Sequence, residues 1–508
     1  MPDTLSHSYE KQLRSLESSG RLNEDSAWEI ASGASLAYVE RFFKDRDSHD
    51  DALGALCALA AHPDPAVSKT GETGLFRLLA ERLSDSFDPD ACALYDMAFV
   101  KIIQFARGRL RGKEIDRALD RFGLFGEKEL IQRKKDMSGL NRPFEEKELK
   151  AVKKCLILSR VSLGAEIAVT SVAIGKILEA CPNAEAVLIG DGAMSGVFHD
   201  VARFRVRHCP YPSGGSLFDR LGIWTAALEI VDDEIRGLDS PEFIVLDPDS
   251  RFSQLGHLPM AEDPGRCLFF QSRSFQALGA DTVSALTSRW MRDVFGGGDA
   301  LPFIRPPKGA VDFARAVRKK ARGRILATVA FGVGGNDDKR LGKEFEAGLI
   351  RRMAREKNVT VLYFKGAGKE EQTRSARILD RLSGSFSVAE LEGDDPGPAV
   401  TGDAPDIIAW QGPLPVYCAL IAESDVHVGY DSSNQHIAAA CRVPLIDVFA
   451  DDTPPVFIQR WTPLGQAPVK TVMAFDKSPE GVQKTLEEVM GLFSSLAASC
   501  PKPHDTTS

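Results

Sequence analysis

The stretch VHVGYDSSNQHIAAACRVPLIDVF, residues 426–449, carries the clearest fold signal in the chain. An apolar run over 425–430 ends at the polar turn DSSNQH, and an Ala-rich run then spans 433–441. A second apolar run follows over 444–449. This order predicts a strand, a helix and a second strand that pairs in parallel with the first. Polar turns that follow the strands of such sheets lie at the edge where ligands bind.

Length and composition indicate a globular protein of several domains. The chain has 508 residues, of which 43% are hydrophobic and 27% charged, and this length predicts about three domains of roughly 150 residues. A net charge of −9 argues against a general binder of nucleic acid or anionic membranes. The nine cysteines lie far apart and form no Cys-x-x-Cys pair, which predicts reduced, mostly buried thiols in a cytosolic protein.

The beginning of the chain, MPDTLSHSYEKQLRSLESSG, is polar and charged and does not resemble a signal peptide. No apolar run approaches the ~20 residues that span a bilayer. We therefore expect a cytoplasmic protein. Any work on membranes or the cell envelope would take place at the inner surface of the cytoplasmic membrane, as a peripheral contact.

Residues 1–140 are predicted to form an all-α N-terminal domain that docks or scaffolds. Apolar residues recur at helical spacing, and Asp-Pro pairs mark helix starts. No fixed repeat period is present. The segments with this spacing are 51–61, 74–84 and 95–110, and the Asp-Pro pairs are Asp64-Pro65 and Asp88-Pro89.

The rest of the chain alternates short apolar strands with helices, which predicts an α/β fold made of two Rossmann-like domains facing a cleft. The Pro-rich segment LPFIRPPKG (301–309) separates the two halves. Strands are predicted over 155–160, 184–190, 243–247 and 266–270 in the first half, and over 325–331, 359–366 and 406–412 in the second, besides those of the opening stretch. The predicted divisions are a helical domain (1–140), a linker (141–153), a first Rossmann-like domain (154–308), a second (309–495) and a flexible tail (496–508).

Three loops carry residues suited to chemistry. In the first, Asp431 or Ser432 can cap the following helix, whose free N–H groups favour an anion, and His436 lies one turn further on. A simple helix cap with a solvated histidine is the alternative interpretation.

The second loop, GVGGNDDKR (332–340), places glycines after a strand, where backbone amides can approach a phosphate. Lys339 and Arg340 supply countercharge, although the Gly-Lys-Ser/Thr ending of a P-loop is absent. The third loop is SLGAE (162–166), where Glu166 could act as a base or could only favour the positive end of a helix.

Together, these loops resemble those of the bacterial heptosyltransferase family, glycosyltransferase family 9, whose members have the two-domain GT-B fold. The resemblance covers about 154–475. The family opens with a strand, Ser-Leu-Gly-Asp and a helix containing Thr-x-Pro; this chain has Ser162-Leu163-Gly164-Ala165 and Thr170-Ser171-Val172. The segment EACPNAEAVLIG (179–190) is similar to the family's second strand and its lead-in.

The second half carries the more specific part of the resemblance. The family has a Gly-containing loop ending in Lys-Arg, here Gly334-Gly335 through Lys339-Arg340. Its most recognisable run is Gly-x-Asp-Thr/Ser-Gly-Pro-x-His-x-Ala-Ala-Ala, followed by a Pro and a Phe. The corresponding residues here run from Gly429 through Asp431, Ser432 and His436 to Ala440, followed by Pro444 and Phe449.

The resemblance implies an inverting glycosyltransferase that moves heptose or a similar sugar from a nucleotide-diphosphate donor, most often ADP-heptose. The implied acceptor is a cell-envelope or other glycan, such as the lipopolysaccharide core or a lipid-linked acceptor. No metal and no cofactor besides the substrate are implied, and no nucleic-acid partner. The implied donor-binding residues are Gly334, Gly335, Lys339, Asp431, Ser432, Ser433 and His436, and Ser162 and Gly164 belong to the implied acceptor-side loop.

Two departures from the family pattern keep other functions open. Ala165 stands where the family has its Asp general base, and Glu166, one step later, is turned by about 100° on a helix, so it replaces that base only if the turn is displaced. Ser433-Asn434 replaces the family's Gly-Pro. The alternatives are a degenerate, non-catalytic GT-B protein that binds a nucleotide sugar or a partner, and another GT-B nucleotide-sugar enzyme such as an epimerase. The N-terminal helices could bind a partner protein.

Overall fold

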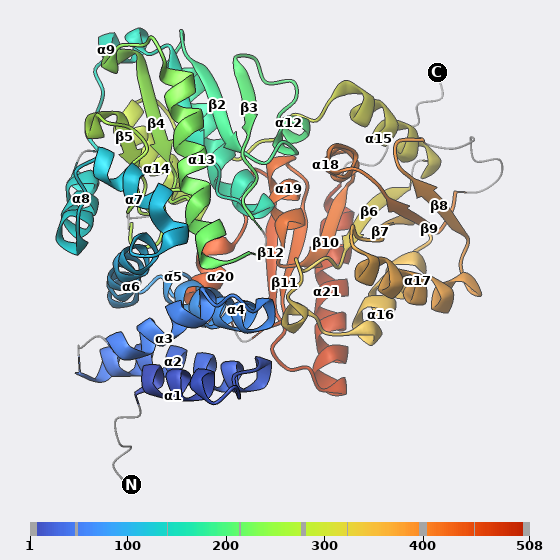
Figure 1. The fold of residues 1–508 in the computed structure, drawn as a ribbon. Coiled ribbons are helices and arrows are strands. Elements are labelled where there is room, and N and C mark those ends of the chain that lie inside the picture. The colour runs from blue at the N-terminus through green and yellow to red at the C-terminus, as the bar shows by residue number, and fades with distance from the viewer. Residues whose placement is uncertain are drawn as a thin grey trace. The chain divides into compact units, whose positions relative to one another are not determined.

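The computed structural model describes residues 8–45, 49–139, 141–212, 215–275, 281–322, 324–395, 404–451 and 453–500. The chain divides into two compact units. The first unit comprises Met1–Val161, Cys181–Asp191 and Arg207–Gln276; the second comprises Ser162–Ala180, Gly192–Val206 and Ala277–Ser508. Each unit contains a parallel β-sheet with helices packed around it (Figure 1).

The first unit begins with a run of helices. They are α1 (Tyr9–Ser18), α2 (Glu24–Asp45), α3 (Asp50–Ala60), α4 (Pro65–Glu72), the π-helix η1 (Thr73–Glu81), α5 (Arg82–Ser84), α6 (Pro89–Arg107), η2 (Leu110–Gly112), α7 (Lys113–Arg121), α8 (Glu127–Gly139) and α9 (Glu146–Ala151). As predicted, the Asp-Pro pairs start helices: the Asp64 carboxylate accepts hydrogen bonds from the backbone of α4, and Asp88 caps α6 in the same way.

The first sheet has the strand order β3-β2-β1-β4-β5. Its strands are β1 (Lys154–Leu158), β2 (Glu185–Gly190), β3 (Phe204–His208), β4 (Phe243–Asp247) and β5 (Cys267–Phe269), and the boundary between the units passes through β3. The helices α13 (Leu217–Ile235), η4 (Ser240–Glu242) and η5 (Pro264–Arg266) complete the unit. β3 was not predicted because this edge strand, FRVRH, has no apolar run.

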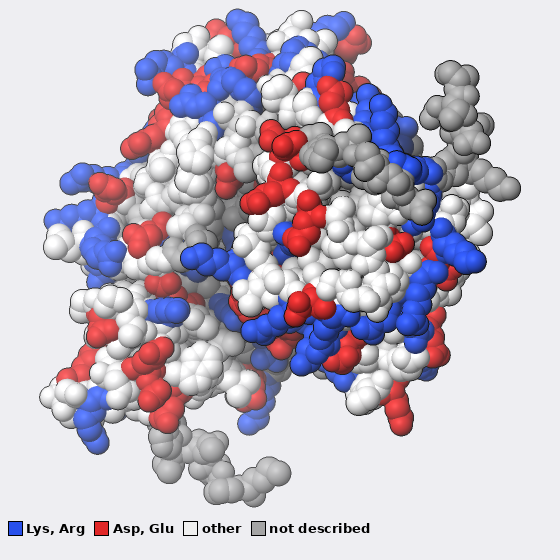
Figure 2. Space-filling view, turned by 90° about the vertical axis from the view of Figure 1, so that its right-hand side faces the viewer, with Lys and Arg blue, Asp and Glu red and all other residues white. Residues whose placement is uncertain are grey.

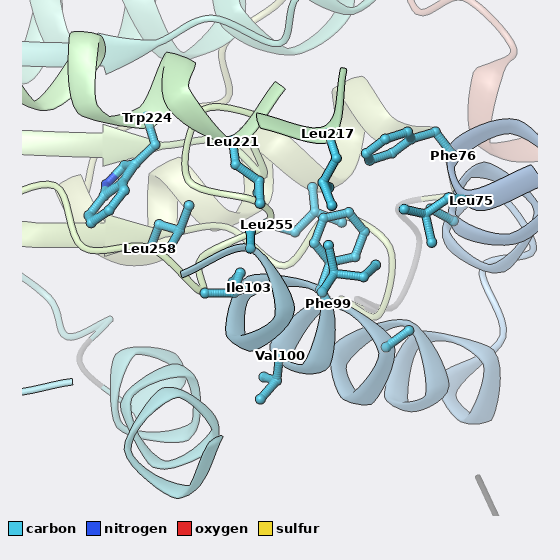
Figure 3. Packing of buried hydrophobic residues seen from close by; sticks show 14 of the residues in the cluster. Leu75, Phe76, Phe99, Val100, Ile103, Leu217, Leu221, Trp224, Leu255 and Leu258 are labelled. Atoms are coloured by element: carbon cyan, nitrogen blue, oxygen red, sulfur yellow. The ribbon is translucent and has the colours of Figure 1, made fainter. Parts of the chain in front are cut away.

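The helices and the sheet of the first unit share one hydrophobic core. Buried side chains of α2, α3 and α6 belong to the same cluster as those of β1, β2, β4 and α13. Figure 3 shows Phe76 of η1 and Phe99 of α6 beside Leu217 and Leu221 of α13 and Leu255, which follows β4. The N-terminal helices are therefore part of the body that contains the first sheet.

The second unit is built on a seven-stranded sheet of order β12-β11-β10-β6-β7-β9-β8, in which neighbouring strands pair in parallel. Its strands are β6 (Ile325–Ala330), β7 (Val359–Phe364), β8 (Val388–Glu392), β9 (Ile407–Gln411), β10 (Val426–Tyr430), β11 (Leu445–Phe449) and β12 (Val469–Met473). The edge strands β8 and β12 were not predicted, because their half-exposed sequences VAELE and VKTVM lack the continuous apolar run of a buried strand.

Two groups of helices flank this sheet, α15, α18 and α19 in one and α16, α17 and α21 in the other (Figure 1). The helices of the unit are α10 (Leu163–Ala165), the π-helix η3 (Glu166–Thr170), α11 (Ser171–Ala180), α12 (Met194–Val197), α14 (Val283–Phe295), α15 (Lys308–Lys320), η6 (Asp337–Lys339), α16 (Lys343–Ala354), α17 (Lys369–Ser383), α18 (Leu414–Ala422), α19 (Ser433–Ala440), α20 (Pro455–Trp461) and α21 (Pro479–Ser499).

The predicted α/β fold with two parallel sheets is confirmed, and residues 425–449 form the predicted unit β10–α19–β11. One local prediction was wrong: residues 163–165 are helical, because α10 begins directly after Ser162. Within the predicted linker lies α9, and α21 extends into the predicted tail, of which 501–508 lie outside the described residues. The domain boundaries remain a prediction; the compact units divide the chain differently.

All nine cysteines are free thiols, and six of them are buried, as predicted. Within the described ranges, no helix combines the length and the apolar character that crossing a bilayer requires. On the face seen in Figure 2, Lys and Arg side chains are interspersed with Asp and Glu, and neither sign covers that face.

Candidate functional site

Four neighbouring strands of the second sheet, β10, β6, β7 and β9, end at one cavity of about 290 Å³, which we call the strand-end cavity. The carboxyl edge of a parallel sheet is where ligands of such folds bind. The lining residues come from these strand ends and from the helices and loops that follow them: Leu163, Ala330, Gly332, Gly334, Phe364, Gly366, Ala367, Glu371, Trp410, Gln411, Gly412, Leu414, Tyr417, Ser432, Ser433 and Asn434.

Three aromatic rings form one wall of the cavity. Phe364 ends β7, Trp410 lies in β9 and Tyr417 is in the first turns of α18. The ring centroids of Phe364 and Tyr417 are 4.4 Å apart at 68°, and Trp410 and Tyr417 lie nearly parallel at 6.4 Å. The Trp410 indole N–H donates to the Gly393 carbonyl at 3.0 Å, which fixes that ring. A rigid aromatic wall of this kind can stack a flat ring such as a nucleobase.

A single acidic side chain, Glu371 of α17, faces the cavity beside this wall. A Cβ on Gly366 would lie 2.5 Å from the Glu371 side chain, and one on Gly332 would lie 3.3 Å from its Oε1. The two glycines therefore make room for the carboxylate, which also accepts a hydrogen bond from the Ala367 N–H at 3.2 Å. A fixed carboxylate in such a place is suited to accept hydrogen bonds from hydroxyl groups of a ligand.

The N-terminus of α19 forms another part of the cavity border. Ser432 is the N-cap residue, but no side chain caps this helix, which corrects the predicted cap by Asp431 or Ser432. The Asp431 carboxylate instead pairs with Lys339. An uncapped first turn leaves backbone N–H groups available to bind an anion, and Ser432 and Ser433 both line the cavity.

Lys339 and Asp431 form the ion pair of the site. Burial alone would lower the pKa of Lys339, but the Asp431 carboxylate outweighs it, so the pKa is raised above its ordinary value. Asp447 of β11, whose carboxyl oxygens have no hydrogen-bond partner among the described residues, is completely buried. Burial, reinforced by Asp431, raises the pKa of Asp447 well above its usual range, so the structure favours the neutral form of this group.

The glycine-rich loop after β6 takes a backbone path that requires glycine. Gly334 and Gly335 have φ values of 61° and 83°, in the left-handed region. Gly334 lines the cavity and Gly335 does not. Arg340 serves the loop itself, since its guanidinium donates to the Phe331 carbonyl and pairs with Asp337. The predicted countercharge therefore comes from Lys339.

His436 lies in α19 between two close neighbours. A Cβ on Gly164 would lie 3.2 Å from Cδ2 of His436, so a glycine lets α10 approach α19. On another side, the ring of His436 meets Trp461 edge to face at 5.9 Å. Burial, with a smaller contribution from the Lys339 charge, lowers the pKa of His436 to about 4, so the ring is neutral at physiological pH. His436 does not line the strand-end cavity.

Glu166, the candidate base, does not reach the cavity either. Its residue is 2% exposed and begins η3, while Leu163 is the residue of this loop that lines the cavity. Ser162 is exposed and likewise lies off the lining. The helical turn through 163–166 sends the Glu166 side chain into the protein, as the angle between successive helical residues leads one to expect.

A buried histidine holds Asn434 in place. Nδ1 of His427 lies 2.8 Å from Oγ1 of Thr328, and its Nε2 lies 3.3 Å from Oδ1 of Asn434. Burial lowers the pKa of His427 to about 4, so the ring carries one proton. Because Oδ1 only accepts, that proton is on Nε2, and the Asn434 amide N–H₂ is left to face Tyr417 and the cavity.

The structure brings together Gly334, Ser432 and Ser433 at the cavity, and beside them Lys339 with Asp431 and Gly164 with His436. Sequence reasoning missed the aromatic wall, Glu371 and Asn434. The aromatic residues at the ends of the predicted strands 359–366 and 406–412 were the available signal. Within the described ranges, no group of three His, Cys, Asp or Glu side chains is placed to hold a metal ion.

Comparisons with known proteins identify the fold. No family model and no curated protein matches the sequence. Among solved structures, glycosyltransferase family 9 from Veillonella parvula is 13% identical, with a TM-score of 0.50, and the match covers 69% of this chain and 98% of that one. Two E. coli structures, ADP-heptose LPS heptosyltransferase II and heptosyltransferase WaaC with ADP, are each 15% identical with TM-scores of 0.44, and cover 67% and 68% of this chain and 99% and 100% of their own. The chain has the fold of glycosyltransferase family 9, as predicted.

Proposed function

We propose that this protein is a glycosyltransferase that uses a nucleotide-diphosphate sugar as donor and holds it in the strand-end cavity. The observation that carries the proposal is that three kinds of group line this one cavity: an aromatic wall, a carboxylate and an uncapped helix N-terminus. They are the groups suited to bind the nucleobase, the ribose and the diphosphate of a nucleotide. The family 9 fold supports the same conclusion.

In this arrangement the base stacks against Trp410 and Tyr417, and the ribose hydroxyls donate to Glu371. The diphosphate lies at the first turn of α19, where the N–H groups and the helix dipole favour negative charge. Lys339, which stays charged because its pKa is raised, exchanges part of its contact with Asp431 for the phosphate oxygens.

Transfer requires two further contributions from the protein. The bond from the anomeric carbon to the diphosphate breaks, and the negative charge that develops on the leaving oxygen is stabilised by the α19 N–H groups and Lys339. An acceptor hydroxyl attacks the same carbon and loses its proton to a base. The buried Glu166 side chain is not placed at the cavity to receive that proton.

The proposal also includes three details of the reaction. The sugar is heptose, the acceptor is a cell-envelope glycan, and transfer inverts the anomeric carbon. These details rest on the sequence resemblance around Asp431 and His436. Cytoplasmic location, with peripheral contact at the inner membrane, is part of the same proposal and rests on the scattered cysteines and the absence of long apolar runs in the sequence.

Binding of nucleotides tests the proposal directly. We would titrate the full chain calorimetrically with ADP, GDP, UDP and CDP and with their sugar conjugates, in parallel with the Tyr417→Leu and Asp431→Ala variants. Saturable binding of one nucleotide that both substitutions weaken is expected. Failure of every nucleotide to bind the wild-type protein would overturn the proposal.

A second function, nucleotide-sugar binding without transfer, is favoured by one specific observation. Ala165 stands where the resemblance places a general base, and the adjacent Glu166 is buried away from the cavity. Glu166→Gln separates the two functions if the wild-type chain transfers sugar to an acceptor. Loss of transfer with unchanged donor affinity would assign Glu166 as the base, and unchanged transfer would place the base elsewhere. A wild-type chain that binds the donor and transfers to no acceptor would be a binding protein.

A further inference from the structure

The carboxyl edge of the first sheet is covered by the N-terminal helices of the same unit. Tyr211 follows β3, Arg251 and Gln254 follow β4, and Arg273 follows β5. Side chains of η1 and α6, among them Phe76 and Phe99, lie on top of these strand-end segments (Figure 3). The edge of a parallel sheet that ordinarily meets a ligand thus has a protein roof.

A cavity of about 30 Å³ remains under this roof, and we call it the arginine cavity. Its walls include three arginines, Arg220 of α13, Arg251 and Arg273, together with the buried Gln254. Aromatic residues from the helices and the strand ends complete it. A cavity of this kind needs only about 10–15 Å³ to hold one water, so the arginine cavity has room for a small polar group of a ligand.

Three N–H donors at this cavity have no hydrogen-bond partner among the described residues. They are Nε of Arg220, Nε of Arg273 and Nε2 of Gln254, and all three atoms are shielded from solvent. Gln254 is only 3% exposed. Buried polar groups are almost always hydrogen-bonded, because leaving a donor unpaired costs about 1–3 kcal/mol. This cavity has three donors without a partner and no acceptor without one, which indicates a ligand that accepts hydrogen bonds.

The guanidinium groups at the cavity favour an anion as this ligand. Arg273 pairs with Asp249 at 2.6 Å and lies 3.7 Å from Asp85, and Arg251 approaches Glu81 at 3.5 Å. The Arg220 guanidinium lies 4.4 Å from the Phe76 ring centroid, and the Glu72 carboxylate interacts with its charge. Two of the three unpartnered donors still belong to guanidinium groups, which bind carboxylate and phosphoryl oxygens through charge-assisted hydrogen bonds.

The wall of the cavity has an exposed part and a strained part. The side chains of Arg251 and Glu81, both in the wall, keep 38% and 41% of their surfaces exposed to solvent. Gln254 and Leu255, also in the wall, have φ values of 50° and 55°, which non-glycine residues adopt at a cost. This backbone conformation holds the Gln254 amide beside the two arginines.

We propose that the arginine cavity binds an anionic group of a ligand, either a carboxylate or a phosphoryl group. The rest of the ligand extends to solvent between the exposed side chains of Arg251 and Glu81. The N-terminal helices form the roof of this site. That the ligand is the acceptor of sugar transfer rests on the proposed function; the anion site itself does not.

The test measures anion binding to the full chain at constant ionic strength. Sodium phosphate and sodium acetate are compared with sodium chloride by calorimetry and by the midpoint of thermal unfolding. We expect phosphate or acetate to bind saturably and to raise the unfolding midpoint, because a ligand of the folded state stabilises it. The anion with the higher affinity identifies the group as phosphoryl or carboxylate.

Variants locate the site. Arg220→Met and Gln254→Glu are each expected to weaken anion binding at least about 10-fold, the loss expected from removing a charge-assisted hydrogen bond. Arg117→Met, on the exposed surface of α7, should bind as the wild type does. Lys339→Met removes the positive charge of the strand-end cavity, so anion binding that this variant keeps and Arg220→Met loses is assigned to the arginine cavity. If phosphate binding disappears with Lys339→Met and survives Arg220→Met, the anion occupies the strand-end cavity and the inference is wrong.

Two outcomes remain decisive even if the variants fold poorly. Absence of any saturable response by the wild-type protein to either anion would overturn the inference. Nucleotide titration tests the proposed function separately. If anion binding depends on Arg220 but no nucleotide binds, the anion site in the arginine cavity is supported and the proposed function is contradicted.

Discussion

Lys339 and Asp431, which are 92 residues apart in the sequence, meet as an ion pair where the loop after β6 and the turn after β10 come together. Nζ of Lys339 also lies 3.5 Å from the backbone carbonyl oxygen of Asp431. The pair is mostly buried, with side chains 19% and 9% exposed. Asp431 thus holds the Lys339 ammonium at the turn that precedes α19 and raises its pKa.

Lys339→Met should weaken binding of a nucleoside diphosphate about 10- to 100-fold, because it removes one charge-assisted hydrogen bond to phosphate. Calorimetric titration measures the change. Lys343→Met, at the exposed start of α16, is the matched control and should leave the affinity unchanged. Equal affinities of the Lys339→Met variant and the wild type would show that Lys339 does not contact the diphosphate.

Tyr417→Leu should weaken nucleotide binding by about 1–3 kcal/mol, the range for loss of one base–aromatic stack. Inorganic pyrophosphate, which has no base, should bind the variant as well as it binds the wild type. Tyr417→Phe keeps the ring and serves as the control. A Tyr417→Leu variant that loses pyrophosphate and nucleotide affinity in equal measure would contradict stacking at this wall.

Affinity for the nucleoside diphosphate should be nearly constant from about pH 7.5 to about pH 9.5, a range above the phosphate pKa of about 6. Asp431 raises the pKa of Lys339 above its ordinary value, so its charge persists through this window. His436, with a pKa of about 4, stays neutral throughout and contributes no titration. A fall in affinity with a midpoint inside the window would mean that Lys339 loses its proton there.

His427→Gln should flatten the acid side of the stability profile. In the folded chain burial lowers the pKa of His427 to about 4, against about 6.5 when unfolded. Between these values the unfolded state binds the extra proton, so the free energy of unfolding falls as the pH falls, by at most about 1.4 kcal/mol per pH unit for this one group. The variant lacks this loss.

Urea unfolding at a series of pH values between about 7 and 4 measures that slope. Identical slopes for His427→Gln and the wild type would show that His427 is protonated in the folded chain.

In both sheets the sequence predicted the inner strands and missed edge strands, for a physical reason. Strands such as β7 and β9 are buried on both faces, so their sequences are continuous apolar runs. Edge strands such as β3 and β12 are partly exposed, and their sequences contain no such run. The turn at 431–436 was recognisable because polar residues directly follow such a run.

The candidate site was only half predictable because its parts come from distant segments. Nothing local to Glu371 or Tyr417 indicates that they face the same cavity as Ser432; only the order of the strands in the sheet brings them together. The role of the Asp431 side chain was missed for a similar reason. Its partner, Lys339, competes with the helix cap that the local sequence favours.

The single core of the first unit limits how this chain can be shortened. A fragment that starts near residue 141 would lose the side chains that cover Leu217, Leu221 and Leu255, and these residues would face water. Such exposed apolar surface promotes aggregation. The helical segment therefore cannot be removed on its own. Limited proteolysis near residue 141 should not release a stable fragment from there to the end of the chain. Any fragment that carries the first sheet has to include the helices that precede it.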